Sequence, residues 1–209
     1  MTLPPSCRWS GDHLELLDQR QLPGAVVFMK LHRWQEVAEA ISSMAVRGAP
    51  AIGIAAAWGV VLAARSGDDL PTAIRGLRAS RPTAVNLGWA LNRMQAAMGS
   101  AAPVDADALA GVAAALQHED CLLTQRLVDH GVSLLAQGCR VLHHCHTGAI
   151  ATGGVGTALG VIAAAHARGL LCHAWLDETR PRFQGAALSA WELGCLGVPS
   201  TVIVDGASG

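Results

Sequence analysis

The stretch Arg140-Val-Leu-His-His-Cys145, followed by the loop His146-Thr-Gly-Ala-Ile-Ala-Thr-Gly-Gly-Val-Gly-Thr157, decides the fold. A short apolar run that leads through a glycine- and threonine-rich loop into an alanine-rich segment predicts a strand, a turn and a helix over 156–168. The pattern recurs downstream, with a strand over 170–176, a helix over 185–196 and a strand over 201–205. Strands and helices that alternate over short connections predict a parallel sheet.

The chain before Gly138 has a different pattern, because apolar residues recur there at steps of three and four. Helices are expected over 34–44, 51–64, 70–78, 86–98 and 106–135. Two short strands, 14–18 and 25–29, flank the turn Leu22-Pro23-Gly24 and predict a β-hairpin. We therefore expect an α/β protein with a mostly helical amino-terminal domain, residues 1–137. A Rossmann-like domain, residues 138–209, follows and is expected to be truncated after its third strand.

The composition is that of a packed protein: 51% of the 209 residues are hydrophobic, 15% are charged, and the net charge is −1. The absence of a basic run argues against a nucleic-acid partner. The six cysteines form no C-x-x-C pair, and the amino terminus lacks the layout of a secretory signal. These features predict a cytoplasmic protein with reduced thiols.

One uncharged segment, residues 48–64, could be taken for a membrane span. It contains Pro50 and is shorter than the roughly 20 residues that a bilayer requires. We expect a buried core helix here and no membrane partner.

Ligands of parallel α/β sheets bind beyond the carboxyl ends of the strands, which groups residues 145–152, 177–184 and 205–209. Cys145 ends the first of these strands and precedes a helix, so it is a candidate catalytic thiol; an ordinary buried cysteine is the alternative. The loop behind it either presents backbone N–H groups to an anion or is a tight turn that packs the helix on the strand. It matches neither a dinucleotide-binding fingerprint nor a P-loop.

The run His143-His144-Cys145-His146 resembles a metal-ligating cluster. Successive side chains of a strand face opposite ways, so His143 would pair with Cys145, and His144 with His146. Neither pair supplies the three or four ligands of a zinc site, and we expect no metal.

Two arginines precede predicted helix starts: Arg47 stands before Gly48-Ala-Pro, and Arg81 before Pro82-Thr-Ala. An arginine beside a helix amino terminus suits a phosphate dianion, through paired charge-assisted hydrogen bonds. Surface salt bridges are the alternative for each arginine. A third candidate, Gln184, follows the loop Asp177-Glu-Thr-Arg-Pro181.

These segments together resemble the signature blocks of the methylthioribose-1-phosphate isomerase family, within the superfamily of initiation factor 2B subunits. The blocks occur in that family's order, between about residues 14 and 209: Arg47-Gly-Ala-Pro-Ala-Ile-Gly53, Arg81-Pro-Thr-Ala-Val-Asn-Leu87, Thr147-Gly-Ala-Ile-Ala-Thr152 with Gly156-Thr-Ala-Leu-Gly160, Asp177-Glu-Thr-Arg-Pro181 and Gln184-Gly-Ala. The resemblance implies a cytosolic homodimer that converts 5-methylthioribose 1-phosphate to 5-methylthioribulose 1-phosphate in methionine salvage. It implies no metal and no organic cofactor.

The resemblance also assigns residues. It places Arg47, Gly48, Ala49, Arg81 and Gln184 on the substrate, with the arginines on its phosphate, and it makes Cys145 the active-site cysteine. The chain departs from the family pattern at three positions, where the family usually has an asparagine, a nearby aromatic residue and an arginine: His146, Val155 and Ala187.

The family's catalytic aspartate lies in a downstream Asp-Arg-x-x-x-Asn-Gly-Asp-like stretch, followed by an Asn-Lys pair, and nothing in this chain matches either. We therefore expect an incomplete fragment without isomerase activity of its own. Whether the hydrogen at C2 moves to C1 as a proton or as a hydride stays open.

Two other functions remain as alternatives. A ribose-1,5-bisphosphate isomerase would need a second basic cluster, which the sequence lacks. A regulatory subunit of the translation-initiation nucleotide-exchange factor type would generally lack Cys145 and the blocks that begin at Arg47 and Arg81.

Overall fold

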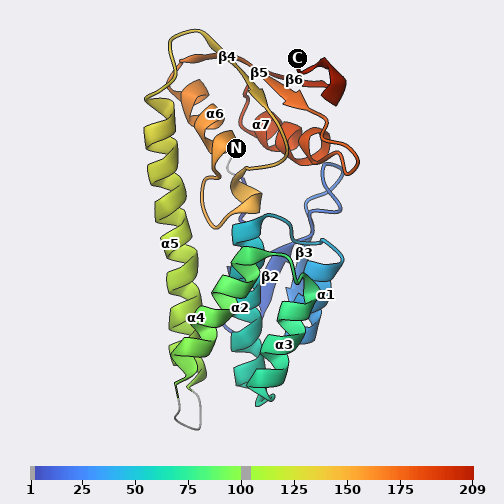
Figure 1. The fold of residues 1–209 in the computed structure, drawn as a ribbon, viewed down its shortest axis with the longest axis vertical. Coiled ribbons are helices and arrows are strands. Elements are labelled where there is room, and N and C mark those ends of the chain that lie inside the picture. Colours follow the sequence, from blue (N-terminus) through green and yellow to red (C-terminus); the bar gives the residue numbers. More distant parts are fainter. Residues whose placement is uncertain (1–2, 100–104) are drawn as a thin grey trace.

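The computed structural model describes residues 3–99 and 105–209. Figure 1 shows an elongated molecule with the amino-terminal helices at one end and a parallel sheet at the other, and the long helix α5 (Ala106–Val132) running along one side. The chain is thus an α/β protein, as predicted.

The amino-terminal strands form a three-stranded antiparallel sheet, with β1 (Cys7–Trp9), β2 (Leu14–Leu17) and β3 (Phe28–Leu31) in that order. The predicted hairpin was therefore incomplete, because a three-residue strand is too short to show an alternating pattern. Its second strand was also placed three residues too early. The turn extends further than expected, since the N–H of Ala25 still donates to Gln21 O.

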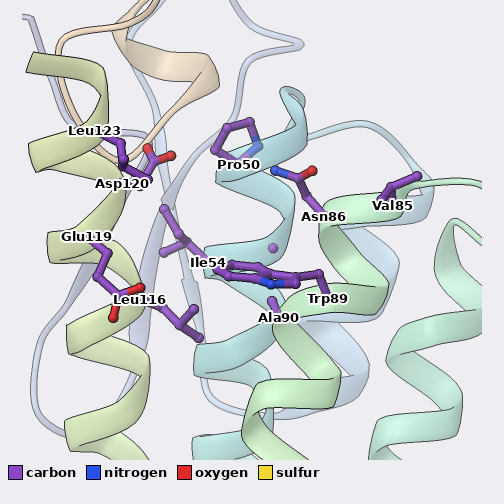
Figure 2. A pocket seen from close by; sticks show the side chains of 11 residues that line it. Pro50, Ile54, Val85, Asn86, Trp89, Ala90, Leu116, Glu119, Asp120 and Leu123 are labelled. Atoms are coloured by element: carbon purple, nitrogen blue, oxygen red, sulfur yellow. The ribbon is translucent and has the colours of Figure 1, made fainter. Parts of the chain in front are cut away.

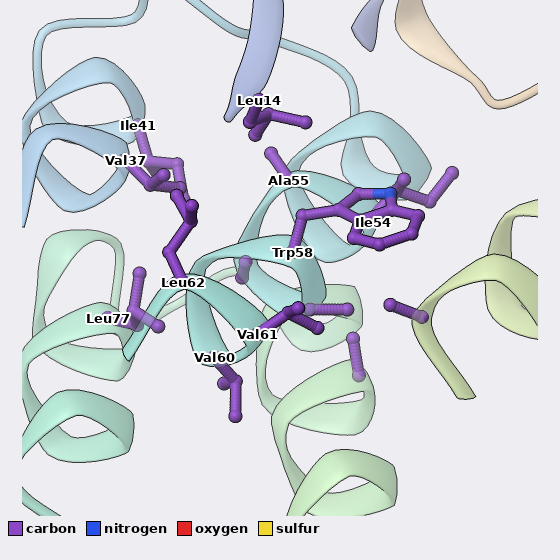
Figure 3. Packing of buried hydrophobic residues seen from close by; sticks show 14 of the residues in the cluster. Leu14, Val37, Ile41, Ile54, Ala55, Trp58, Val60, Val61, Leu62 and Leu77 are labelled. Atoms are coloured by element: carbon purple, nitrogen blue, oxygen red, sulfur yellow. The ribbon is translucent and has the colours of Figure 1, made fainter. Parts of the chain in front are cut away.

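All five predicted amino-terminal helices are present: α1 (Trp34–Ser42), α2 (Ala49–Ser66), α3 (Leu70–Ser80), α4 (Val85–Met98) and α5. Within the described residues, α2 is the one helix long and apolar enough to cross a membrane. Its residues 51–63 are all buried, however, and Figure 3 shows Leu14, Val37, Ile41 and Leu77 packed around it. The prediction of a core helix is confirmed.

The carboxyl-terminal sheet is parallel and has the order β4-β5-β6: β4 (Cys139–His143), β5 (Leu171–Asp177) and β6 (Ser200–Ile203). The helices α6 (Ala158–Ala167) and α7 (Ala190–Cys195) lie beneath it in Figure 1. Three short turns of helix complete the chain: η1 (Ala149–Ala151), the π-turn η2 (Gly185–Ser189) and η3 (Asp205–Ala207).

Several predicted boundaries at the functional edge were too wide. The first strand ends at His143 because Cys145 has a φ of 71°, in the left-handed region. The next helix begins at Ala158 rather than 156, since Gly156 has a φ of 87°. The third strand ends at Ile203, where the chain turns into η3, and the helix expected over 185–196 begins with the π-turn η2.

A small apolar cluster joins the two ends of the molecule: it combines Leu17 and Leu22 from the amino-terminal sheet region with Ile150 and Leu188 from η1 and η2. Because these residues are buried together, the loops beyond the parallel sheet are fixed against the helical part. The domain boundary expected at residues 137–138 lies between α5 and β4 and stays a prediction.

Candidate active site between the helices and the parallel sheet

A cavity of about 750 Å³ lies where the loops of the helical part meet the loops beyond β4 and β5. All six residues predicted for the site line it: Arg47, Gly48, Ala49, Arg81, Cys145 and Gln184. The cavity therefore brings together residues as far apart in the sequence as Met44 and Leu188.

Three arginines face this cavity: Arg47, Arg81 and Arg182. Among the described residues, none of the three forms an ion pair with a carboxylate. Burial, and next the positive charge of Arg182, lower the pKa of Arg47; the nearby Cys145 opposes this effect and Arg81 adds to it. Uncompensated positive charge that converges on a hollow favours a multiply charged anion.

Two helix amino termini reinforce the positive field. Helices α2 and α4 begin beside the cavity, with Gly48 and Ala84 as caps, and neither cap makes a side-chain hydrogen bond. The first N–H groups of a helix have no acceptor within the helix and carry the positive end of its dipole. The arginines and the two helix ends thus form a site suited to phosphate.

Position 48 requires glycine both for its backbone conformation and for the close packing around it. Its φ is 98°, and a Cβ built there would lie 2.3 Å from the carbonyl oxygen of Ala151. Behind it, the amide of Gln19 donates to the carbonyl oxygens of both Arg47 and Ile150, at 3.2 and 2.9 Å. The loop that carries Arg47 is therefore tied to the loop that follows β4.

Two backbone hydrogen bonds hold Cys145 in place, one from its N–H group and one to its carbonyl oxygen. Its N–H donates to Oγ1 of Thr179 at 3.0 Å, and its carbonyl oxygen accepts from Oγ of Ser189 at 3.0 Å. The side-chain amide of Gln184 donates to the sulfur, with Nε2 and Sγ 3.5 Å apart. A non-glycine residue with a left-handed φ that is fixed in this way is typical of a functional position.

The glycine-rich loop after Cys145 is a tight turn and does not present its N–H groups to the cavity. The N–H groups of Ala149 and Ile150 donate to the carboxylate of Glu192, and that of Gly153 donates to Asp120. Those of Gly154 and Gly156 donate to Thr152 Oγ1. Of the two alternatives for this loop, the structure favours the tight turn, because protein carboxylates and a hydroxyl already satisfy these donors.

The histidine run alternates only at its start, where His143 is buried and His144 is exposed. The predicted pairing of His144 with His146 was wrong: the His146 side chain is only 4% exposed, because the strand ends at His143 and Cys145 has a left-handed φ. Burial lowers the pKa of His143 to about 4. His144 and two carboxylates beyond the strand ends, Asp177 and Asp205, place one potential ligand atom each within 4.8 Å of one another. These groups bind protein partners: Asp177 accepts from Ser208 and contacts His144 Nδ1 at 2.8 Å, while Asp205 accepts from two backbone N–H groups. Asp177 accordingly has its pKa lowered, first by Ser208 and then by His144.

A second cavity, of about 360 Å³, lies next to the first and shares Val85 and Asn86 with it. Figure 2 shows Trp89, Ile54 and Pro50 around it, with Glu119 and Asp120 on the facing helix α5. It contains no arginine or lysine. Burial raises the pKa of Asp120, whose carboxylate accepts from Gly153.

Sequence reasoning missed several residues of the site. Asn86 lies within a quoted block and Arg182 lies between two of them, and both line the cavity, so their closeness to the blocks was the available signal. Gln19 carried no local signal, since its contact with Ile150 spans 131 residues. The pairing of His146 with Glu192 spans 46 residues and was equally hidden.

Comparison with known proteins identifies the family of the chain. The sequence profile of the initiation factor 2 subunit family matches residues 45–209. The chain belongs to this family. Within the family, it is 91% identical over all 209 residues to the methylthioribose-1-phosphate isomerase of Synechococcus sp. (strain CC9605), and 74% identical to that of Parasynechococcus marenigrum (strain WH8102). The resemblance seen in the sequence is confirmed.

Solved structures of family members share the fold. The 5-methylthioribose 1-phosphate isomerase of Pyrococcus horikoshii OT3 matches all of the chain and 62% of its own length, with a TM-score of 0.92 and 36% identity. The translation initiation factor eIF-2B subunit delta from A. fulgidus matches 98% of the chain and 63% of its own length, with a TM-score of 0.85 and 34% identity. The chain spans 62% of the length of both cyanobacterial isomerases.

Proposed function

We propose that these residues form the sugar-phosphate site of an aldose–ketose isomerase that converts 5-methylthioribose 1-phosphate to 5-methylthioribulose 1-phosphate. The observation that carries the proposal is the convergence of Arg47, Arg81 and Arg182 with Cys145 and two helix amino termini on one cavity. The 91% identity to an isomerase of that name supports it. The arginines and helix ends hold the phosphate, and Gln184 orients Cys145.

The residue types suit the reaction. The phosphate of this substrate sits on the anomeric carbon, so ring opening requires a proton at the ring oxygen. The hydrogen on C2 then moves to C1, either as a proton through an enediol or as a hydride while the C2 hydroxyl loses its proton. Cys145 stabilises charge next to the reacting carbons.

The second cavity supports a thioether rather than a second phosphate at the far end of the sugar. Its lining is mostly apolar and contains no arginine or lysine to hold a phosphate, and the charge of Glu119 is already paired with Arg93. An apolar methylthio group gains from contact with Trp89 and Ile54. This observation favours 5-methylthioribose 1-phosphate over ribose 1,5-bisphosphate.

Among the described residues, no carboxylate lines the larger cavity. A general acid contributes roughly 10²- to 10⁴-fold to such a reaction. We therefore propose that the 209-residue chain binds the sugar phosphate but turns it over far more slowly than the ~1 per second of ordinary enzymes. Turnover at an ordinary rate by the purified chain would place the acid within these residues, with Asp177 and Asp205 as the first to replace.

Isothermal titration calorimetry of the 209-residue chain tests the substrate class. We expect 5-methylthioribose 1-phosphate to bind more tightly than ribose 1-phosphate, and ribose 1,5-bisphosphate to bind no better than ribose 1-phosphate. Trp89→Ala should reduce the preference for the thioether by roughly tenfold, whereas Trp175→Ala, on the exposed face of the sheet, should not. Tightest binding of the bisphosphate would contradict the proposal.

A further inference from the structure

A buried hydrogen-bonded pair, His146 and Glu192, adjoins Cys145, and the proposed function gives it no role. Nε2 of His146 lies 2.8 Å from Oε1 of Glu192, and the two side chains are only 4% and 2% exposed. His146 also lines the larger cavity, whereas Glu192 lies behind it on α7. The pair therefore connects the interior of the sheet domain with the wall of the cavity.

The surroundings of Glu192 determine which nitrogen of His146 carries hydrogen. The carboxylate accepts the N–H of Ala149 at 2.8 Å and that of Ile150 at 3.2 Å, so both of its oxygens are already acceptors. With both oxygens engaged by backbone donors, the carboxylate is an acceptor towards His146 as well. Nε2 of His146 must then donate, and in the neutral ring Nδ1 holds a lone pair.

A lone pair has a clear use in this cavity. Its arginines offer only donors, and these suit phosphate oxygens but not the hydroxyl hydrogens of a sugar. Among the described residues, the side-chain oxygen of Gln184 is buried without a hydrogen-bond partner and is a second acceptor of this kind. A sugar phosphate carries donors as well as an anionic group, so both kinds of partner are required.

We propose that Glu192 is a positioning residue that holds His146 with hydrogen on Nε2, and that Nδ1 of His146 accepts a hydrogen bond from a hydroxyl group of the bound sugar phosphate. The class of ligand rests on the proposed function, but the tautomer does not. The competing explanation is that the hydrogen bond between His146 and Glu192 only stabilises the loop and has no role in binding. The experiments below distinguish the two explanations.

Nuclear magnetic resonance tests the tautomer without any ligand. Long-range ¹H–¹⁵N correlation of the uniformly ¹⁵N-labelled chain distinguishes the two ring nitrogens, and the signals that disappear in His146→Asn belong to His146. We expect hydrogen on Nε2. Glu192→Gln should shift hydrogen towards Nδ1, because its amide can donate to Nε2; circular dichroism reports whether this variant folds. Hydrogen on Nδ1 in the unaltered chain would overturn the proposal even if Glu192→Gln does not fold.

Calorimetry tests the contact with the sugar. We expect His146→Ala to weaken binding of 5-methylthioribose 1-phosphate by roughly threefold to tenfold, the value of one neutral hydrogen bond, and to leave inorganic phosphate unaffected. His146→Asn should restore most of the affinity, because its side-chain oxygen takes the place of Nδ1 and accepts from the ligand, although its amide is too short to reach Glu192 as Nε2 does. Unchanged sugar-phosphate affinity in His146→Ala would refute the contact. Failure of the unaltered chain to bind any sugar phosphate would instead refute the proposed function. The tautomer of His146, measured without ligand, would still test the positioning role of Glu192.

Discussion

The side-chain amide of Gln184 lies 3.5 Å from the sulfur of Cys145, although 39 residues separate them in the sequence. The contact joins the loop beyond β4 to the loop beyond β5, at the carboxyl ends of two neighbouring parallel strands. It brings the thiol into the cavity that the arginines line, and several expected outcomes depend on this arrangement.

The reactivity of Cys145 should reflect the charge of the cavity. Three arginines attract an anionic reagent to Cys145. The ratio of the labelling rate with iodoacetate to that with neutral iodoacetamide should therefore be higher at Cys145 than at the exposed Cys172. Peptide mass spectrometry measures both rates in one sample. Inorganic phosphate should slow labelling at Cys145 alone. Equal reagent preference at both cysteines would be inconsistent with an anion site beside the thiol.

Replacement of Gly48 should damage both stability and binding. Gly48→Ala places a Cβ against the Ala151 carbonyl in a left-handed conformation, so we expect a loss of about 1–3 kcal/mol or more in the free energy of unfolding. Gly67→Ala is the matched control, because Gly67 has a φ of 71° at the other end of α2 but no atom within 4 Å of its Cβ position.

Urea unfolding and phosphate titration of both variants separate strain from contact. Gly67→Ala should lose only the conformational part, ~1 kcal/mol, and bind ligand normally. If Gly48→Ala were no less stable than Gly67→Ala and bound phosphate equally well, the close approach of α2 to η1 would not matter to the site.

The stability of the chain should depend on pH through His143. Its pKa is lowered to about 4 in the folded state, whereas an unfolded histidine titrates near 6.5. The unfolded chain therefore binds more protons between these values. The part of the free energy of unfolding that depends on His143 is fully present above about pH 6.5 and is lost as the pH falls towards 4. We expect a loss of about 2 kcal/mol between pH 7 and pH 5 that is absent in His143→Gln. Parallel pH dependence of unfolding in the two proteins would show that His143 is not buried as a neutral ring.

The sequence predicted the secondary structure where periodicity was long and unambiguous. The five amino-terminal helices and the three parallel strands were recognised because each carries several turns or a bounded apolar run. Single backbone conformations were not predictable: the left-handed Cys145 ended its strand early, and Gly156 delayed the next helix. The strand Cys7–Trp9 was missed because three residues cannot display a period.

The residues of the candidate site likewise divide into those that the sequence could predict and those that it could not. Arg47, Arg81 and Cys145 were predictable because each stands at the border between a loop and a regular element. Gln19 and Glu192 were not, since their roles arise from contacts over 131 and 46 residues that only the packed structure defines. For the same reason the sequence could not decide between the two alternatives for the glycine-rich loop: its N–H groups donate to protein carboxylates that are remote in the sequence.

The most direct test of the sugar-phosphate site is calorimetric binding of 5-methylthioribose 1-phosphate to the 209-residue chain and to its arginine variants. A charge-assisted hydrogen bond contributes roughly 1.5–3 kcal/mol, so Arg47→Ala and Arg81→Ala should each weaken binding by roughly tenfold or more. Arg81→Lys should also weaken it, because an ammonium group cannot replace the planar fork. The control, Arg75→Ala on the exposed side of α3, should bind normally. Unchanged affinity in Arg81→Ala would contradict the assignment of this cavity to the phosphate.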